Sequence, residues 1–419
     1  MTSPTALQLL ATTLFALAIL HTFAARHFER LAHVQPRHAG LWHLLGEIEI
    51  VFGVWAVVLV VALFALQGKS ETLAYLESRN YTEPMFVFAI MVIAASRPVL
   101  QLADLLVRRI AAALPLASGP ALGLCVLSVV PLLGTFITEP AAMTVAALML
   151  RETVFAAPVS TRLQYATLGV LFVNISIGGT LTPFAAPPVL MVAGPWGWDM
   201  AFMLTHFGWK AALAVAVNAA GLTWLFRREL STLALSAGPA RLTVPAPLVL
   251  VHLLFLAGVV VFAHHPVVFI GLFLLFMGVV TAYREHQDRL ILREALLVAF
   301  FLAGLVVLGG LQAWWLQPLL MGMSEDAVFF GAAALTAITD NAALTYLGSL
   351  VEGLSSEFQV ALVAGAVAGG GLTVIANAPN PAGVAILREK FPDGAVKAGA
   401  LLLAALPPTG VALLAFRLP

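Results

Sequence analysis

Two short polar segments interrupt strongly apolar stretches of the chain. The first, FITEPAAMT, covers residues 136–144, and the second, AITDNAALT, covers residues 337–345. Aligned on each other, they place Glu139 opposite Asp340. A carboxylate near the centre of a bilayer costs at least about 2.5–3.5 kcal/mol on insertion scales. Two carboxylates at matched positions therefore indicate that the protein uses them.

These carboxylates could hold a metal cation and a proton in turn. An ionised carboxylate supplies hard oxygen ligands for a cation. When the cation leaves, a carboxylate removed from water takes up a proton, because an isolated buried charge is unstable. The pattern predicts a Na⁺ site at Asp340, Asn341 and Glu139 that exchanges Na⁺ for H⁺. The structural alternative is that each carboxylate caps the helix that follows it.

Hydroxyl and amide side chains near the two segments could complete a coordination shell without adding charge. The candidates are Thr138, Thr339, Thr144, Asn341, Thr345, Thr182, Thr373, Asn377 and Asn380, with Asn174 and Ser176 as weaker ones. For any single threonine, the alternative is a hydrogen bond to a carbonyl of its own helix.

Arg97 interrupts an apolar stretch in the sequence AASRPVL. An arginine within a membrane normally faces the protein interior and finds a partner there. The expected partner is Glu139, Asp340 or Asp104. The alternative is an arginine that extends to the membrane interface.

A cluster of ionisable residues lies at the cytoplasmic end of the expected span 44–66, in the sequence HLLGEIEIVFG. His43 and Glu47 are four residues apart, which would place them on one face of a helix. Together with Glu49 they could form a pH-sensing entrance. An ordinary cluster of interfacial charges is the alternative.

The composition indicates an all-α polytopic membrane protein. The chain is 61% hydrophobic and 10% charged, with a mean hydropathy of +0.99, whereas soluble domains carry about 25% charged residues. A single cysteine, Cys125, excludes an internal disulfide. About ten spans of sufficient length are expected. They cover residues 4–25, 44–66, 84–106, 163–198, 208–226, 246–263, 267–283, 295–312, 358–387 and 396–415.

The segments 119–150 and 327–352 contain the polar segments and are expected to be re-entrant hairpins. Segment 119–150 has arginines on both sides, and Lys and Arg collect in cytoplasmic loops. With both segments as hairpins, most basic residues lie inside, and both termini are external. The loops that carry Lys69 and Arg79 are then external, as is the turn at His264.

A second pair of matched sequences indicates an inverted repeat. GGTLTPFAAPP begins at Gly178 and GGGLTVIANAP begins at Gly369. Glycine and proline break helices, and freed backbone groups persist at membrane depth only where they line a cavity. Inverted repeats with discontinuous helices are typical of secondary transporters. The predicted division is 1–43, a first span and cytoplasmic loop; 44–226, the first repeat; 227–266, a linker and connecting helix; and 267–419, the second repeat.

The sequences ITDNAALT and GGGLTVIANAPNPAG resemble the paired motifs of the ion transporter superfamily. More narrowly, they resemble a bacterial family of Na⁺/H⁺ antiporters related to NhaD-type antiporters and arsenite permeases. The resemblance implies two re-entrant hairpins, two broken helices, a homodimer in the bacterial inner membrane and elevator-like alternating access. The acidic tips favour a cation over an organic acid as the substrate. Asp340 is expected to be the principal exchanging carboxylate, because Asn341 stands beside it.

Besides a cation antiporter, two other classes of function are open to a chain of this composition. A transporter of the same fold that moves a small organic or inorganic anion is the alternative, with Arg97 as its substrate-side charge. An intramembrane enzyme is not expected, since the chain has no His-Glu-x-x-His, Gly-x-Ser-x-Gly or P-loop sequence. We expect no cofactor and no nucleic-acid partner; the expected partners are lipid and small cations.

Overall fold

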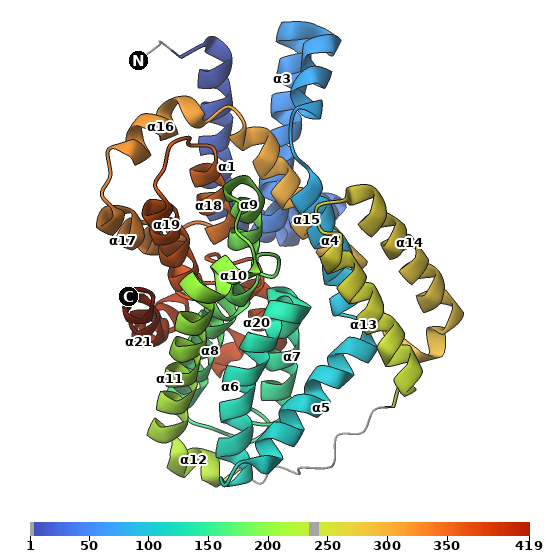
Figure 1. Ribbon diagram of the computed structural model, residues 1–419, viewed down its shortest axis with the longest axis vertical. Coiled ribbons are helices and arrows are strands. Elements are labelled where there is room, and N and C mark those ends of the chain that lie inside the picture. Colours follow the sequence, from blue (N-terminus) through green and yellow to red (C-terminus); the bar gives the residue numbers. More distant parts are fainter. Residues whose placement is uncertain (1–3, 234–242) are drawn as a thin grey trace.

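The computed structural model describes residues 4–233 and 243–419, and within those ranges it consists of helices and connecting loops without strands (Figure 1). Its α-helices are α1 (Ala6–Val34), α2 (Ala39–Gly46), α3 (Ile48–Glu77), α4 (Thr82–Ala94), α5 (Arg97–Ala113), α6 (Ser118–Ile137), α7 (Glu139–Glu152), α8 (Thr161–Gly178), α9 (Pro187–Trp196), α10 (Met200–Met203), α11 (Trp209–Leu225), α12 (Arg227–Ser231), α13 (Ala246–Val261), α14 (Pro266–Ala282), α15 (Leu292–Gly309), α16 (Ala313–Met321), α17 (Glu325–Thr336), α18 (Asn341–Ser349), α19 (Ser356–Gly369), α20 (Asn380–Leu387) and α21 (Ala398–Phe416). Short 3-10 segments lie at Pro36–His38, Gly179–Leu181, Arg284–His286, Arg388–Lys390 and Pro392–Gly394, and a π-helical turn, Leu204–Gly208, joins α10 to α11.

The described residues confirm a polytopic helical membrane protein, although the spans differ in number from the expected ten. Seven helical stretches are long and apolar enough to cross a bilayer, and the bent pair of α4 and α5 makes an eighth. Helices α13, α14 and α19 are apolar but have only 16, 17 and 14 residues. A straight crossing needs about 20 residues. Part of the predicted linker 227–266, residues 234–242, lies outside the described residues.

Several boundaries differ from those expected. The predicted span 84–106 is bent by 65° between α4 and α5. Pro98 lies in the first turn of α5 and has no N–H to continue the helix from α4. Helix α3 runs well past residue 66, with a kink at Gly68, where φ is +83°. The stretch expected to begin at residue 208 begins at Met200.

Each polar segment marks a break between two helices. The first separates α6 from α7, and the second separates α17 from α18. The GG-x-LT sequences mark two further breaks, which separate α8 from α9 and α19 from α20. We call the segments between these helix pairs the first break (179–186) and the second break (370–379).

The helices beside these breaks pack in a corresponding pattern in the two halves of the chain. Helix α6 packs against α8, and α17 packs against α19. The helices that follow the polar segments cross over to the other half, because α7 packs against α20 and α18 against α9 (Figure 1). The two halves therefore interlock at the centre of the molecule.

Glycines make the close packing within each half sterically possible. A Cβ at Gly178 of α8 would lie 2.6 Å from the carbonyl oxygen of Pro131 on α6. A Cβ at Gly369 of α19 would lie 2.4 Å from the carbonyl oxygen of Ala333 on α17. Small residues allow membrane helices to approach through their backbones, and here they do so at corresponding places.

Outside this interlocked part, α3 and α15 form a second close pair. A Cβ at Gly304 of α15 would lie 2.4 Å from the backbone nitrogen of Gly53 on α3. Around this contact, the rings of Phe52 and Phe301 meet edge to face with centroids 5.2 Å apart. Helix α15 also packs against α4, and α4 contacts α13 and α14, which form a pair at one side of the molecule (Figure 1).

This contact yields a stability prediction. Gly304→Ala should destabilise the protein by about 1–3 kcal/mol, because the added methyl group meets the α3 backbone, which cannot yield as a side chain would. The measurement is thermal unfolding of the purified protein in detergent. Gly278→Ala on α14 is the matched control, since a Cβ there meets nothing within 4 Å. Equal melting temperatures for the two variants would contradict the close contact.

Candidate functional site

The turn between α6 and α7 holds the backbone in an unusual conformation. Thr138 has φ +71° and ψ 153°, and among the described residues it is the only non-glycine residue with a positive φ. Such a conformation costs a β-branched residue about 1–3 kcal/mol and persists only where surrounding structure enforces it. Strained positions of this kind cluster at functional sites. The next residue begins α7 and is Glu139.

Glu139 is completely buried, with an exposed fraction of 0%. Its Oε2 accepts a hydrogen bond of 2.8 Å from Nδ2 of Asn377 in the second break. Its Oε1 has no hydrogen-bond partner. Gly179 makes room for this carboxylate, since a Cβ there would lie 2.8 Å from both Cγ and Oε1. The first polar segment thus inserts a carboxylate between the two breaks.

The second tip is built differently. Asp340 is half-buried, and its Oδ1 accepts from the backbone nitrogens of Ala342 at 2.8 Å and Ala343 at 3.2 Å. The cap that sequence reasoning left open as an alternative is therefore present at Asp340. Asp340 also lies within electrostatic range of Glu139. The two tips meet in one region, with the fully buried carboxylate on the first of them.

Asparagines join the second tip to the second break. The backbone nitrogen of Asn341 donates to the carbonyl oxygen of Ala376 at 3.1 Å, and its Nδ2 donates to Oγ of Ser176 at 3.4 Å. Asn380 donates through Nδ2 to the carbonyl oxygens of Gly370 at 2.8 Å and Thr373 at 2.9 Å. In each asparagine the side-chain NH₂ group forms hydrogen bonds within the protein, whereas the side-chain oxygen has no hydrogen-bond partner.

The predicted threonines divide into two groups. Thr182 donates to the carbonyl oxygen of Thr135 at 3.0 Å, and Thr373 donates to that of Ala337 at 2.9 Å, so each ties a break to the helix before its tip. Thr144 and Thr345 bond to carbonyls of their own helices, as the alternative for a membrane threonine holds. Thr339 is half-buried.

Five buried side-chain oxygens without partners belong to residues of the polar segments, of the second break and of the start of α20. Buried polar atoms are nearly always hydrogen-bonded, and each exception calls for an explanation. Here the exceptions are Oγ1 of Thr138, Oε1 of Glu139 and Oδ1 of Asn341, Asn377 and Asn380. All five can donate an electron pair, and four belong to neutral groups. We name these atoms the oxygen cluster.

The oxygen cluster suits a small hard cation of low charge. Hard cations take carboxylate, amide carbonyl and hydroxyl oxygens as ligands. Transition metals favour imidazole or thiolate ligands, and the part of the chain that the structure describes contains no group of three or more His, Cys, Asp or Glu residues able to hold a metal ion. One buried carboxylate among neutral oxygens balances one positive charge, whether a proton or a monovalent cation carries it.

Arg97 does not take the partners expected for it. Its guanidinium donates to Oγ1 of Thr243 at 3.0 Å and lies 3.7 Å from Oδ1 of Asp288. Asp288 lies in the exposed loop before α15, so Arg97 sits at the edge of the helical region, as the interfacial alternative proposed. The bend after α4 explains the difference, since it places Arg97 at the start of α5. Asp104 pairs with Arg108 instead.

The predicted pH-sensing entrance is also not assembled as expected. Helix α2 ends at Gly46 and Glu47 is extended, with φ −79° and ψ 118°, so His43 and Glu47 do not share a helix face. Glu47 forms an ion pair with Arg293, and His43 is exposed. The side chain of Glu49 lies outside the described residues.

Two buried polar features, one beside the site and one apart from it, were not predicted from the sequence. Asn218 of α11 donates to Oδ1 of Asn174 at 2.9 Å and to the carbonyl oxygen of Pro408 at 3.2 Å, which joins α8, α11 and α21 beside the site. The isolated asparagine within an apolar helix was the available signal. Glu83, the second feature, is buried at the start of α4.

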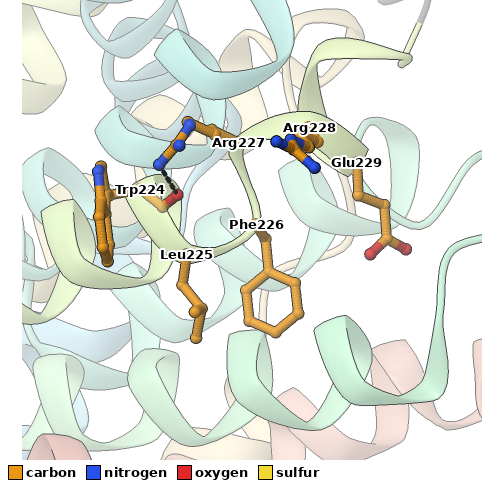
Figure 2. Close-up of a pocket in the computed structure, with 6 residues that line it drawn as sticks. All are labelled: Trp224, Leu225, Phe226, Arg227, Arg228 and Glu229. Atoms are coloured by element: carbon orange, nitrogen blue, oxygen red, sulfur yellow. Dashed lines mark hydrogen bonds between the residues drawn. The ribbon is translucent and has the colours of Figure 1, made fainter.

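A surface pocket of about 380 Å³ lies at the corner between α11 and α12 and is lined by residues 224–229 (Figure 2). Arg227 folds back there to donate to the carbonyl oxygen of Trp224 at 3.3 Å. Glu229 accepts from Oγ of Ser160 at 3.0 Å. The pocket contains none of the predicted site residues.

The comparison with protein families agrees with this chemistry. Residues 6–419 match the family model described as "Putative Na+/H+ antiporter". The chain belongs to this family. Members of such a family are transporters and not enzymes, so the expectation that the chain is not an enzyme is confirmed. The narrower relation to NhaD-type antiporters and arsenite permeases stays a prediction.

Among solved structures, the chain is similar to the Alcanivorax borkumensis YdaH transporter. The two share 17% sequence identity, and the match covers 88% of this chain and 96% of that chain with a TM-score of 0.49. No curated protein sequence matches the chain.

The contact between the halves can be tested by a double-mutant cycle. Asn377→Ala should lower the free energy of unfolding by about 1.5–3 kcal/mol, because it removes a hydrogen bond to a charged or protonated buried carboxyl group. In a Glu139→Leu background the same substitution should cost much less. Unfolding in mixed detergent micelles measures both. Strictly additive effects would show that the two side chains do not depend on each other.

Proposed function

We propose that this protein is a secondary active transporter that exchanges Na⁺, or another small monovalent cation, for H⁺. The observation that carries the proposal is Glu139, fully buried where the two halves interlock, with one oxygen bonded to Asn377 and the other belonging to the oxygen cluster. A carboxylate in such a place must be neutralised by a proton or by a bound cation. Family membership supports the same reading.

Glu139 is the exchanging carboxylate in this proposal, in place of Asp340, which sequence reasoning preferred. Glu139 has one oxygen held by Asn377 and one oxygen without a partner. Asp340 has an oxygen engaged as a helix cap, and its field reaches Glu139. Asp340 therefore adds negative potential that favours a proton or a cation bound at Glu139, while the amide oxygens of Asn341 and Asn377 serve as neutral ligands.

In this proposal the protein works by alternating access, in which the same site opens to one side of the membrane and then to the other. A cation bound at Glu139 excludes the proton and a proton excludes the cation, so each passage of the site through the membrane carries one of them. The breaks supply backbone and amide groups at membrane depth, as discontinuous helices do in secondary transporters. The alternative, an anion as substrate, loses its main support because the contacts of Arg97 are with Thr243 and Asp288.

The membrane, the oligomeric state and the topology are proposed from the family resemblance of the sequence and from the distribution of its basic residues. The protein acts in the bacterial inner membrane as a multi-pass homodimer, with both termini external and no cofactor. Lipid and the exchanged cations are its expected partners.

The exchange is tested by proton flux in proteoliposomes loaded with a pH-sensitive dye. Adding Na⁺, Li⁺ or K⁺ on one side should evoke proton movement in the wild type. Glu139→Gln should abolish it, because an amide keeps the size of the side chain but holds no exchangeable charge. Asp340→Asn should retain transport with weaker cation affinity, since asparagine also caps helices.

Glu152→Gln is the matched control, because Glu152 ends the same helix as Glu139 but is exposed. Undiminished flux in Glu139→Gln would remove the assigned role. Uptake of a solute anion without any cation-evoked proton movement would replace the proposal with the anion alternative.

Competition for one carboxylate also predicts the dependence on pH. Suppose that one proton must leave for each cation that binds. Where the site is mostly protonated, the apparent dissociation constant of the cation then rises about tenfold for each unit by which the pH falls. At higher pH, where the site is mostly deprotonated, the constant no longer depends on pH. The measurement is the Na⁺ concentration for half-maximal flux at several equal internal and external pH values. A constant that does not change with pH would contradict direct competition.

A further inference from the structure

Glu83 is a second buried carboxylate that the exchange at Glu139 does not use. It lies in the first turn of α4 and is only 8% exposed. Its Oε1 accepts a hydrogen bond of 3.1 Å from Nδ2 of Asn80. Among the described residues, no Lys, Arg or His comes within ion-pair distance of it. An acidic residue this buried is almost always paired, and here no cationic side chain fills that role.

The carboxylate of Glu83 lines a cavity of about 140 Å³. The share of liquid volume for one water is about 30 Å³, so the cavity has room for a small cation with part of its hydration shell. Its walls come from four parts of the chain: the start of α4, the first break, α9 and the end of α13. The lining residues are Thr82, Glu83, Phe86, Pro183, Phe184, Leu190, Ala193, Gly194, Val260, Ala263 and His264.

Gly194 of α9 lies at the polar part of this cavity. A Cβ at Gly194 would lie 3.7 Å from Oε1 of Glu83 and 4.0 Å from Cε1 of His264. The two ionisable side chains thus face the same glycine of α9 from two different elements. His264 is exposed, whereas Glu83 is buried. The cavity therefore leads from an exposed imidazole to an enclosed carboxylate.

The cavity adjoins the segment that holds the exchanging site. Pro183 and Phe184 of the first break line it. The residue before them, Thr182, donates to the carbonyl of Thr135 on α6, three residues before the strained turn. A Cβ at Gly179 of the same break would lie 2.8 Å from Oε1 of Glu139. One short segment thus borders the cavity on one side and Glu139 on the other.

We propose that this cavity is an outer cation-binding site, in which Glu83 receives a partly hydrated monovalent cation before it passes to Glu139. The proposal rests on the cation exchange proposed above and adds the place where the cation enters. The loop before α4 and the turn at His264 both fall on the side predicted to be external.

The charges around Glu83 favour a cation at this place. His264 lines the cavity, and Tyr346 of α18 lies within the electrostatic range of Glu83. Arg79 and Tyr81 belong to the same surroundings, but the Arg79 guanidinium donates to Oγ of Ser78 at 3.0 Å and lies over the ring of Tyr75, so it forms no ion pair with Glu83. The tyrosines and His264 do not cancel a carboxylate at neutral pH, since tyrosine is uncharged and histidine is mostly neutral there. A single negative charge in a recess with apolar walls concentrates cations from solution.

Charge-selective labelling of a single cysteine tests the site without requiring transport. In a Cys125→Ser background, which removes the one native cysteine, His264→Cys places a thiol at the cavity. Cationic and anionic methanethiosulfonate reagents are applied in turn to the protein in vesicles. The cationic reagent should react faster, and Na⁺ should slow it. Phe184→Cys provides a second position should the first variant fold poorly.

Glu83→Gln should lower the ratio of cationic to anionic labelling rates by about tenfold, the low end of the effect of a charged cleft on association. Glu77→Gln is the matched control, because Glu77 ends α3 nearby but is exposed. A ratio unchanged by Glu83→Gln, or thiols that do not react at either position, would overturn the outer site.

Flux measurements separate this proposal from the one on which it rests. Glu83→Gln should raise the Na⁺ concentration for half-maximal flux by about tenfold while the maximal flux is largely kept, because the charge that concentrates the cation is lost. Glu139→Gln should abolish flux yet leave the labelling ratio intact. Charge-selective labelling of the His264→Cys variant, together with a wild type that moves no cation, would overturn the proposed function and retain the site.

Discussion

The structure depends on a carboxyl group, that of Glu139, held entirely out of water between two halves of one chain. Burial of this group is costly unless it is compensated, and the hydrogen bond from Asn377 compensates only one of its two oxygens. The surroundings are arranged to keep it there: a strained turn at Thr138 aims it inward, and Gly179 leaves space for it. A residue that served only to stabilise the fold would not need this arrangement, since an apolar side chain of similar volume would pack at no such cost.

Much of the site could be predicted from the sequence because its parts are local and repeated. A glutamate and an aspartate at matched positions in apolar surroundings mark the tips, and the glycine and proline runs mark the breaks. Asn377 was found through the same motif. The difference between the tips could not be predicted, because a helix-capping carboxylate and a fully buried one occupy the same place in the motif. Only the burial of Glu139 and the two backbone contacts of Asp340 distinguish them.

Contacts between distant parts of the chain were beyond sequence reasoning. Arg97 meets Asp288 because a bend after α4 reorients the start of α5, and a hydropathy pattern does not report bends. Glu83 looked like an ordinary acidic residue in the first turn of a helix, where such residues are common. Its burial comes from α9 and α13, which are remote in sequence. The length of α3 was missed because its last turns run past the apolar stretch through mostly exposed residues, which a hydropathy pattern does not report.

The crossed packing of α7 on α20 and α18 on α9 limits how this molecule can change shape. Pulling the halves apart would separate Asn377 from Glu139 and expose both breaks to hydrocarbon. Any movement that presents Glu139 to one side of the membrane and then to the other must therefore carry the tips and breaks of both halves as one body. The boundary along which such a body would slide then lies where it meets α4, α5 and α15, away from Glu139.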